Sequence, residues 1–257
     1  SGSPLAMMNV IRICARYGNL DILEESYGIN LRMILEYAER YYEPSEAFQP
    51  RLVEGVRLSD DEKALLNKLQ EATAILQFKL ESQLIKRRPD FQLEHRDVLH
   101  FIDFSEKTIK LGTEVYELTD FQAPTVNPEQ PESLTAEEEK IISHLLNNFR
   151  SSDKLKRHVE FLQEKGAMYL SYNGNLLIHG CLPLHENGDF KSFTVNKEAH
   201  AGRDLLDFFD QEVRKCLAHP ENSTDLATDL MWYLWVGECS SLFGKTAMTT
   251  FERYYIK

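Results

Sequence analysis

The spacing of apolar residues predicts that the first part of the chain is helical. Apolar positions from Leu5 to Ala15 lie three or four residues apart and form one face of a helix. Gly18 can end that helix because glycine adopts a positive φ without strain. Residues 21–25 and 30–42 are also predicted to be helical.

A longer helix is predicted next. Ser59 and Glu62 have the spacing of a capping box, in which each side chain accepts a hydrogen bond from a free backbone amide at a helix start. Apolar residues then recur from Leu65 to Leu84, before Pro89. We interpret this stripe as a long amphipathic helix packed on its own domain, with a coiled-coil partner as the alternative.

Short strands and a loop are predicted in the middle of the chain. Residues 98–118 contain three short strand-like runs separated by polar turns. The polar stretch from Pro124 to Pro131 then reads as a loop or linker. Thr135 opens a second capping box and another helix, and a further helix is predicted over 153–165.

A β-hairpin is the clearest pattern in the second half. Residues 167–172 and 175–178 are predicted strands, and Asn173-Gly174 between them is typical of a two-residue turn. The returning strand is apolar, which predicts that it is buried. It ends at His179.

The rest of the chain is predicted to be mostly helical. Helices are expected over residues 200–217 and 224–236, and residues 240–255 are expected to form a loop followed by a strand. Trp232 and Trp235 lie three residues apart in the second helix and are predicted to be core residues.

Charge and composition narrow the function classes. The chain has 41 acidic and 29 basic residues, and its net charge of −12 disfavours nucleic-acid binding through a basic face. The longest strongly apolar stretch, Leu230–Val236, is far shorter than the roughly 20 residues of a membrane helix, so no membrane association is predicted. The four cysteines are scattered without a C-x-x-C pair, which predicts reduced thiols in the cytoplasm.

Both ends of the chain resemble cuts through a longer protein. Ser1–Pro4 leads directly into a helical pattern, and the aromatic run Phe251–Lys257 stops without a polar tail. We therefore expect an internal fragment.

His179 is the strongest candidate for a residue that binds a ligand. It lies between an apolar strand and Gly180, and ligands concentrate at the carboxyl ends of strands in α/β proteins because loops there open over a rigid sheet. Gly180 is expected to leave room for a metal or a phosphate. A hydrogen-bonded structural histidine is the alternative for such a residue taken alone.

Several short sequence segments then point to one family. The segment Leu177–Leu184 resembles the V-H-G-G-L-S-P segment of metallophosphoesterases such as the Ser/Thr protein phosphatases. Taken together, these and further segments resemble the bacterial class III fructose-1,6-bisphosphatases over essentially the whole chain. Those that carry this wider resemblance are Asn9–Asn19, Asp225–Asp229, Trp232–Trp235, Ser240–Lys245 and Thr249–Tyr254.

The resemblance implies a gluconeogenic phosphatase that removes the 1-phosphate of fructose 1,6-bisphosphate. It also implies two manganese ions that bind the phosphate and supply a hydroxide, with His179 as one metal ligand. The family's D-x-H, G-D-x-x-D-R-G and G-N-H-D motifs are expected before the chain begins, and its S-H-T motif beyond Lys257. No catalytic residue and no activity are therefore expected in this fragment alone.

Three basic residues are candidates for the phosphate groups of the sugar bisphosphate. They are Arg203, Lys245 and Arg253, whose side chains suit phosphate oxygens. A solvated side chain or a structural ion pair is the alternative for each.

The predicted fold class is α/β, with α+β character in the fragment. Residues 153–257 are predicted to form part of a metallophosphoesterase-type sandwich, and residues 1–152 a mostly helical insertion or cap with a short β-hairpin region. Two other functions stay open: a protein-phosphatase-like enzyme, and a non-enzymatic helical interaction module built on the stripe from Leu65 to Leu84. The sequence is compatible with a homo-oligomer.

Overall fold

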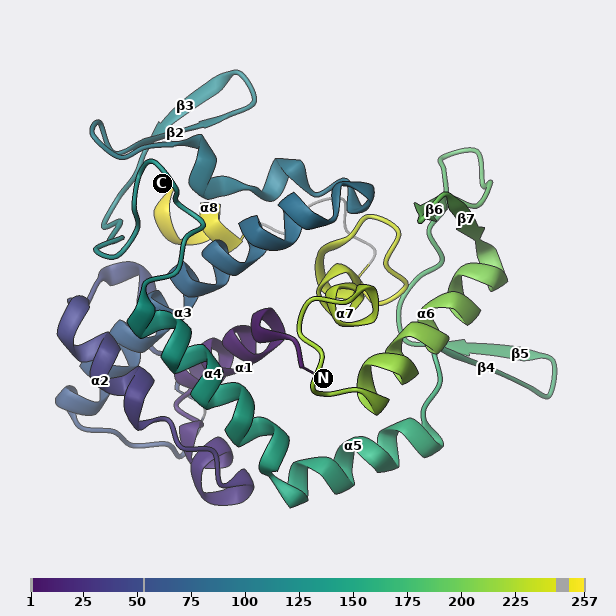
Figure 1. Ribbon diagram of the computed structural model, residues 1–257, viewed down its shortest axis with the longest axis horizontal. Helices are drawn as coiled ribbons and strands as arrows, with labels where there is room; N and C mark the ends of the chain where they lie inside the picture. Colours follow the sequence, from purple (N-terminus) through teal and green to yellow (C-terminus); the bar gives the residue numbers. More distant parts are fainter. Residues whose placement is uncertain (1, 53, 244–249, 257) are drawn as a thin grey trace. The chain divides into compact units, whose positions relative to one another are not determined.

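The protein mixes α-helices with short antiparallel strands (Figure 1). The computed structural model describes residues 2–52, 54–243 and 250–256. The helices are α1 (Pro4–Tyr17), α2 (Arg32–Tyr41), α3 (Asp60–Arg87), α4 (Ala136–Ser151), α5 (Asp153–Lys165), α6 (Gly202–Ala218), α7 (Leu226–Val236) and α8 (Thr250–Tyr255). A π-helix covers Ile22–Ser26, and 3-10 turns cover Glu46–Phe48, Pro89–Phe91, Glu94–Arg96 and Val98–Phe101.

The strands form small antiparallel sheets. They are β1 (Ile102–Asp103), β2 (Thr108–Leu111), β3 (Glu114–Glu117), β4 (Tyr169–Tyr172), β5 (Asn175–Ile178), β6 (Ser192–Val195) and β7 (Glu198–Ala201). In the described part of the chain they pair as β1-β2-β3, β4-β5 and β6-β7. The predicted mixture of helix and strand is therefore confirmed. The metallophosphoesterase sandwich stays a prediction.

The chain divides into two compact units. Unit 1 comprises residues 1–3, 84–94 and 155–248, and unit 2 comprises residues 4–83, 95–154 and 249–257. Most of the predicted cap thus belongs to unit 2, and most of the predicted core belongs to unit 1. The domain boundary at residues 152–153 stays a prediction about the complete fold.

Helix α3 is the centre of unit 2. Its predicted cap is confirmed: the Ser59 amide donates to Glu62 Oε2 at 2.7 Å, and the Glu62 amide donates to Ser59 Oγ at 3.2 Å. However, every residue from 69 to 82 is buried. The prediction of an amphipathic helix is wrong over this stretch, because polar side chains face the interior as well as apolar ones. A helical stripe buried in this way contradicts the interaction-module alternative.

A buried ion pair joins α3 to α4. Lys79 Nζ lies 2.8 Å from Glu138 Oε2, and neither side chain has any exposed surface. Tyr37 and Thr125 each donate a hydroxyl hydrogen bond of 2.7 Å to Glu138 Oε1. The capping box at Thr135 is confirmed, and its N3 member is this same Glu138. Because the Thr125 hydroxyl donates a hydrogen bond to Glu138, the proline-containing stretch around Thr125 packs within unit 2.

Glu71 is a second buried acid on α3. Its Oε1 accepts hydrogen bonds from the Gln122 amide at 3.2 Å and from the Tyr255 hydroxyl at 3.1 Å. These bonds favour the ionised carboxylate. Burial has the larger effect, and it raises the pKa of Glu71 to about 8.

The raised pKa of Glu71 predicts a falling stability with rising pH. An unfolded glutamate titrates near pH 4.3, so between about pH 4.5 and about pH 8 the folded protein holds a proton that the unfolded chain has lost. The free energy of unfolding should then fall by up to about 1.4 kcal/mol per pH unit because of this group. Glu71→Gln, which stays neutral, should flatten the profile in urea unfolding followed by circular dichroism. Equal slopes for the two proteins would contradict the assignment.

The predicted strand at the end of the chain is wrong, because residues 250–255 form helix α8. Its aromatic side chains fill the core of unit 2: Phe251 packs edge-on against Phe78, and Tyr254 stacks on Phe48 with ring centroids 4.2 Å apart. Aromatic residues favour strands in isolation, but here their burial on one side of a short helix decides the conformation.

Unit 1 is built around α6 and α7. Trp232 is buried, as predicted, while Trp235 is half-buried against Phe243. Asp229 accepts hydrogen bonds from Arg87 Nε at 2.9 Å and from Arg88 Nε at 2.7 Å, which fixes the end of α3 to α7. No helix of the described residues is long and apolar enough to cross a membrane.

Two hairpins complete unit 1. The turn Asn173-Gly174 joins β4 to β5, as predicted, with φ values of 50° and 74°. The second hairpin, β6–β7, was not predicted. Its turn residues Asn196 and Lys197 also have positive φ, at 51° and 70°, but they lack the glycine that marks such turns in a sequence.

Candidate functional site

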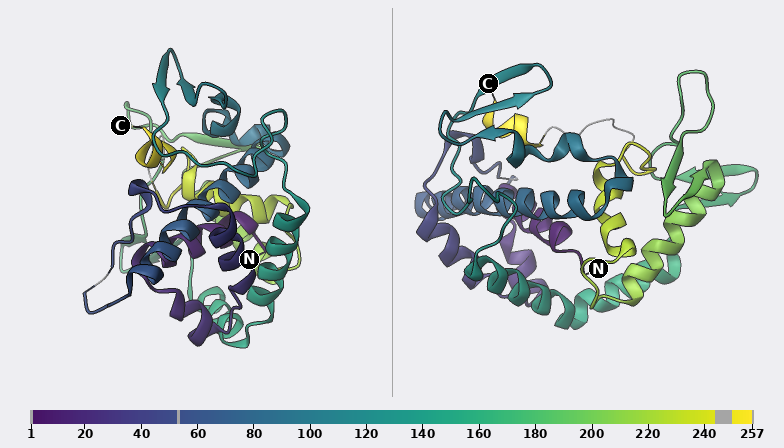
Figure 2. Two further views of the ribbon diagram at one scale, coloured as in Figure 1. Left: turned by 90° about the vertical axis from the view of Figure 1, so that its left-hand side faces the viewer. Right: turned by 45° about the horizontal axis from the view of Figure 1, so that its top comes forward.

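His179 follows β5 and is exposed. The strand before it is not buried as predicted: Leu176 and Leu177 are 51% and 53% exposed. The reason is that β4 and β5 form a two-stranded ribbon, and the described residues add no third strand to it. Figure 1 and the right-hand view of Figure 2 show this ribbon projecting from α6.

Gly180 approaches protein backbone. A Cβ atom placed on it would lie 2.5 Å from the carbonyl oxygen of Ser241, and the Cys181 amide donates to the same oxygen at 3.1 Å. The space that the glycine leaves is therefore taken by residues 241–242. The expectation that it is kept open for a metal or a phosphate is wrong.

The described residues do not form a metal site by themselves. No group of three or more His, Cys, Asp or Glu side chains among them is arranged to hold an ion. A two-metal centre needs more ligands than His179 provides. The role of His179 as a metal ligand stays a prediction.

Arg203 lies at the same end of the hairpin as His179. Its Nε donates to the Tyr169 hydroxyl at 3.0 Å, and that hydroxyl donates to Asp207 Oδ1 at 2.9 Å. Tyr169 is the strand partner of Ile178, the residue before His179. The hydrogen bond to Tyr169 is the main reason that the pKa of Arg203 is raised. The guanidinium is 82% exposed, and its Nε also lies 3.6 Å from Asp207 Oδ2, so an anion bound here would share Arg203 with that carboxylate.

The other two predicted substrate residues stay predictions. Arg253 is exposed on α8 and belongs to unit 2, whereas His179 and Arg203 belong to unit 1. Lys245 lies outside the described residues.

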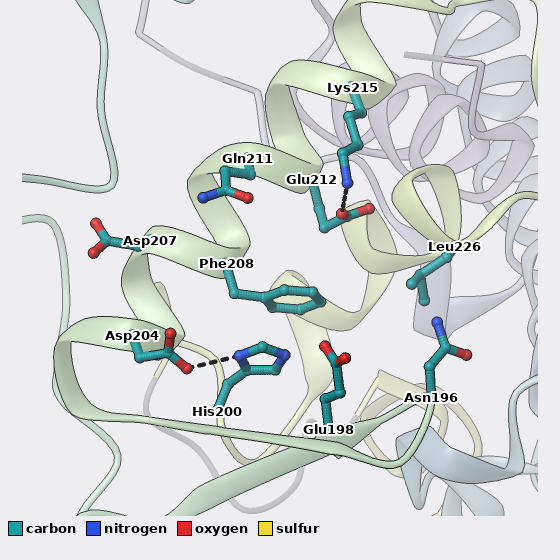
Figure 3. Close-up of a pocket in the computed structure, with 10 residues that line it drawn as sticks. All are labelled: Asn196, Glu198, His200, Asp204, Asp207, Phe208, Gln211, Glu212, Lys215 and Leu226. Atoms are coloured by element: carbon teal, nitrogen blue, oxygen red, sulfur yellow. Dashed lines mark hydrogen bonds and ion pairs between the residues drawn. The ribbon is translucent and has the colours of Figure 1, made fainter.

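A pocket of about 400 Å³ opens between the β6–β7 hairpin and α6 (Figure 3). His200 is fixed at its floor: Nδ1 lies 2.7 Å from Asp204 Oδ2, and the ring stacks on Phe208 at 4.2 Å. Nε2 is buried and has no hydrogen-bond partner among the described residues. The i, i+4 spacing of His200 and Asp204 at a helix start is the sequence signal that could have indicated this pair.

The charges around this pocket do not suit a phosphate. Four carboxylates line it against one lysine, Lys215, which is paired with Glu212. A sugar bisphosphate would meet a net negative surface here. The exposed end of the β4–β5 hairpin, with His179 and Arg203, is therefore the better candidate site.

Comparisons with known proteins agree with the motifs. A family model described as Firmicute fructose-1,6-bisphosphatase matches residues 1–257. The chain is 88% identical over 257 residues to the fructose-1,6-bisphosphatase class 3 of Lactococcus lactis subsp. cremoris (strain MG1363). It is 52% and 51% identical to the proteins of the same name from Streptococcus agalactiae serotype Ia and Bacillus velezensis.

The match covers all of this chain but only part of each relative. The chain spans 40% of the length of these curated relatives. No solved structure matches it. Since the family model covers every residue, the chain belongs to the Firmicute fructose-1,6-bisphosphatase family.

Proposed function

We propose that the protein containing this chain hydrolyses the 1-phosphate of fructose 1,6-bisphosphate, as a cytoplasmic enzyme of gluconeogenesis. The observation that carries this proposal is the family match over residues 1–257, together with three relatives of that name at 51–88% identity. The chain alone, which spans 40% of the relatives' length, is proposed to be inactive.

His179 is proposed as one ligand of a manganese centre. Its exposure at the end of β5 supports this role, because a ligand must be reachable by the ion and by the other ligands. Those other ligands are proposed to come from the part of the family's polypeptide that this chain does not span. Hard carboxylate and imidazole ligands of that kind suit manganese.

Arg203 is proposed to bind a phosphate group of the substrate. Its hydrogen bond to Tyr169 limits the motion of the guanidinium, which lowers the entropy lost when an anion binds. Arg253 and Lys245 are also proposed to bind phosphate oxygens of the substrate, because their charged side chains suit such anions. The partial metallophosphoesterase sandwich is proposed as the fold that unites these residues.

A full-length chimera tests the proposed function. In it, this chain replaces the matching segment of the Lactococcus lactis relative, to which it is 88% identical. The chimera should release phosphate from fructose 1,6-bisphosphate when manganese is present, and the 257-residue chain alone should not. Faster release from a phosphopeptide than from the sugar would favour the protein-phosphatase alternative. Phosphate release by the chain alone would contradict the proposed inactivity.

A further inference from the structure

The β4–β5 hairpin exposes apolar side chains on both of its faces. Successive side chains of a strand point to opposite faces, so Leu176 and Leu177 cannot share one. Both are about half exposed, and so is Leu170, the strand partner of Leu177. Strands that are apolar on both faces are normally covered on both sides.

The edges of this hairpin carry none of the usual protection against pairing. An exposed edge strand is normally protected by charged residues or proline, which prevent another strand from adding to it. Residues 169–178 contain no charged residue and no proline. Every second backbone amide of each strand points away from its partner, and the described residues provide no third strand to accept from it.

The other hairpins differ in this respect. Strand β3 of the β2–β3 hairpin is also exposed, but that hairpin carries Lys110, Glu114 and Glu117. The β6–β7 hairpin carries Glu198, and its apolar residues Phe193 and Val195 are buried. Only the β4–β5 hairpin among these three is both uncharged and uncovered.

We propose that the β4–β5 hairpin is a docking surface for the part of the family's polypeptide that this chain does not span, which adds at least one β-strand to it and covers its apolar faces. The relatives contain enough further chain to do so, because this chain spans 40% of their length. The inference concerns folding and assembly and does not depend on the reaction that the protein catalyses.

Hydrogen exchange measures the docking directly. In the 257-residue chain, the outward-pointing amides of residues 169–178 should exchange rapidly. In the full-length chimera they should be protected by on the order of 100-fold or more, because a cooperatively paired strand exchanges only when it opens. The amides of β6–β7 should change little and provide the internal control.

A matched pair of substitutions separates docking from local folding. Leu177→Lys and Val115→Lys each place a charge on an exposed strand position, 53% and 62% exposed respectively. In the chain alone, neither should lower the melting temperature appreciably. In the chimera, Leu177→Lys should lower it by about 5 °C or more because the charge would be buried, while Val115→Lys should not.

The outcomes are distinct. Fast exchange of residues 169–178 in a chimera that still releases phosphate would overturn the docking proposal and leave the proposed function standing. Protection that rises with the concentration of the chain alone would show that a second copy occupies the surface, which would also overturn it. Protection in the chimera without phosphate release would support docking and count against the proposed function.

Discussion

Lys79→Met should destabilise the protein by about 3–5 kcal/mol, because it leaves the Glu138 carboxylate buried without its partner charge. Neither side chain has exposed surface, so water cannot replace the lost ammonium. The Tyr37 and Thr125 hydroxyls would still donate to the carboxylate, but neutral donors cannot compensate a buried charge fully. Urea unfolding followed by far-ultraviolet circular dichroism measures the loss, because the helices of unit 2 contribute to that signal.

Two control variants identify the source of this loss. The double variant Lys79→Met/Glu138→Gln removes both charges and keeps an acceptor for Tyr37, so it should be more stable than Lys79→Met alone. Arg32→Met breaks an exposed pair with Glu36 and should cost less than about 1 kcal/mol. If Lys79→Met were as mild as Arg32→Met, the buried pair would have no special role in stability.

His179→Ala in the full-length chimera should reduce phosphate release by at least about 100-fold, since even the loss of a residue that only supports a metal ligand costs roughly 10–100-fold. The bound manganese, measured after gel filtration, should fall as well. The melting temperature of the 257-residue chain should not change, because His179 is exposed in it.

His219→Ala is the matched control for this variant. His219 is an exposed histidine of the same unit, and its partner is Glu221 at 3.1 Å. Its replacement should leave manganese content and phosphate release unchanged. If His179→Ala kept both the metal and the activity, the proposed role of His179 would be wrong.

The local signals in the sequence predicted the elements that depend on local chemistry. The capping boxes at Ser59 and Thr135 and the turn Asn173-Gly174 satisfy their own backbone groups or dihedral preferences, so neighbouring residues are enough to specify them. Helix α8 and the burial of α3 depend on residues distant in the sequence. A spacing rule therefore could not predict that Lys79 would face the interior, because its partner Glu138 lies on another helix.

The candidate site was predictable only in part, for a similar reason. The sequence indicated His179 and Arg203 separately, and the contact that brings them to one end of the hairpin is made by Tyr169, which no motif singled out. The predicted role of Gly180 is wrong because its neighbour, the backbone at Ser241, is far away in the sequence. The remaining ligands proposed for the metal centre are not among the described residues.

The core of unit 2 is formed by stretches that are separated by nearly the whole chain. This separation affects how the protein folds during its synthesis. Arg12 donates to the Tyr254 hydroxyl at 2.9 Å across 242 positions, and Phe121 packs edge-on against Tyr255. A ribosome must therefore synthesise most of unit 1 before the interior of unit 2 can close. Until then, the rings of Phe48, Phe78 and Phe121 lack the aromatic partners that cover them. The unfinished chain is therefore expected to bind chaperones that recognise exposed apolar surfaces.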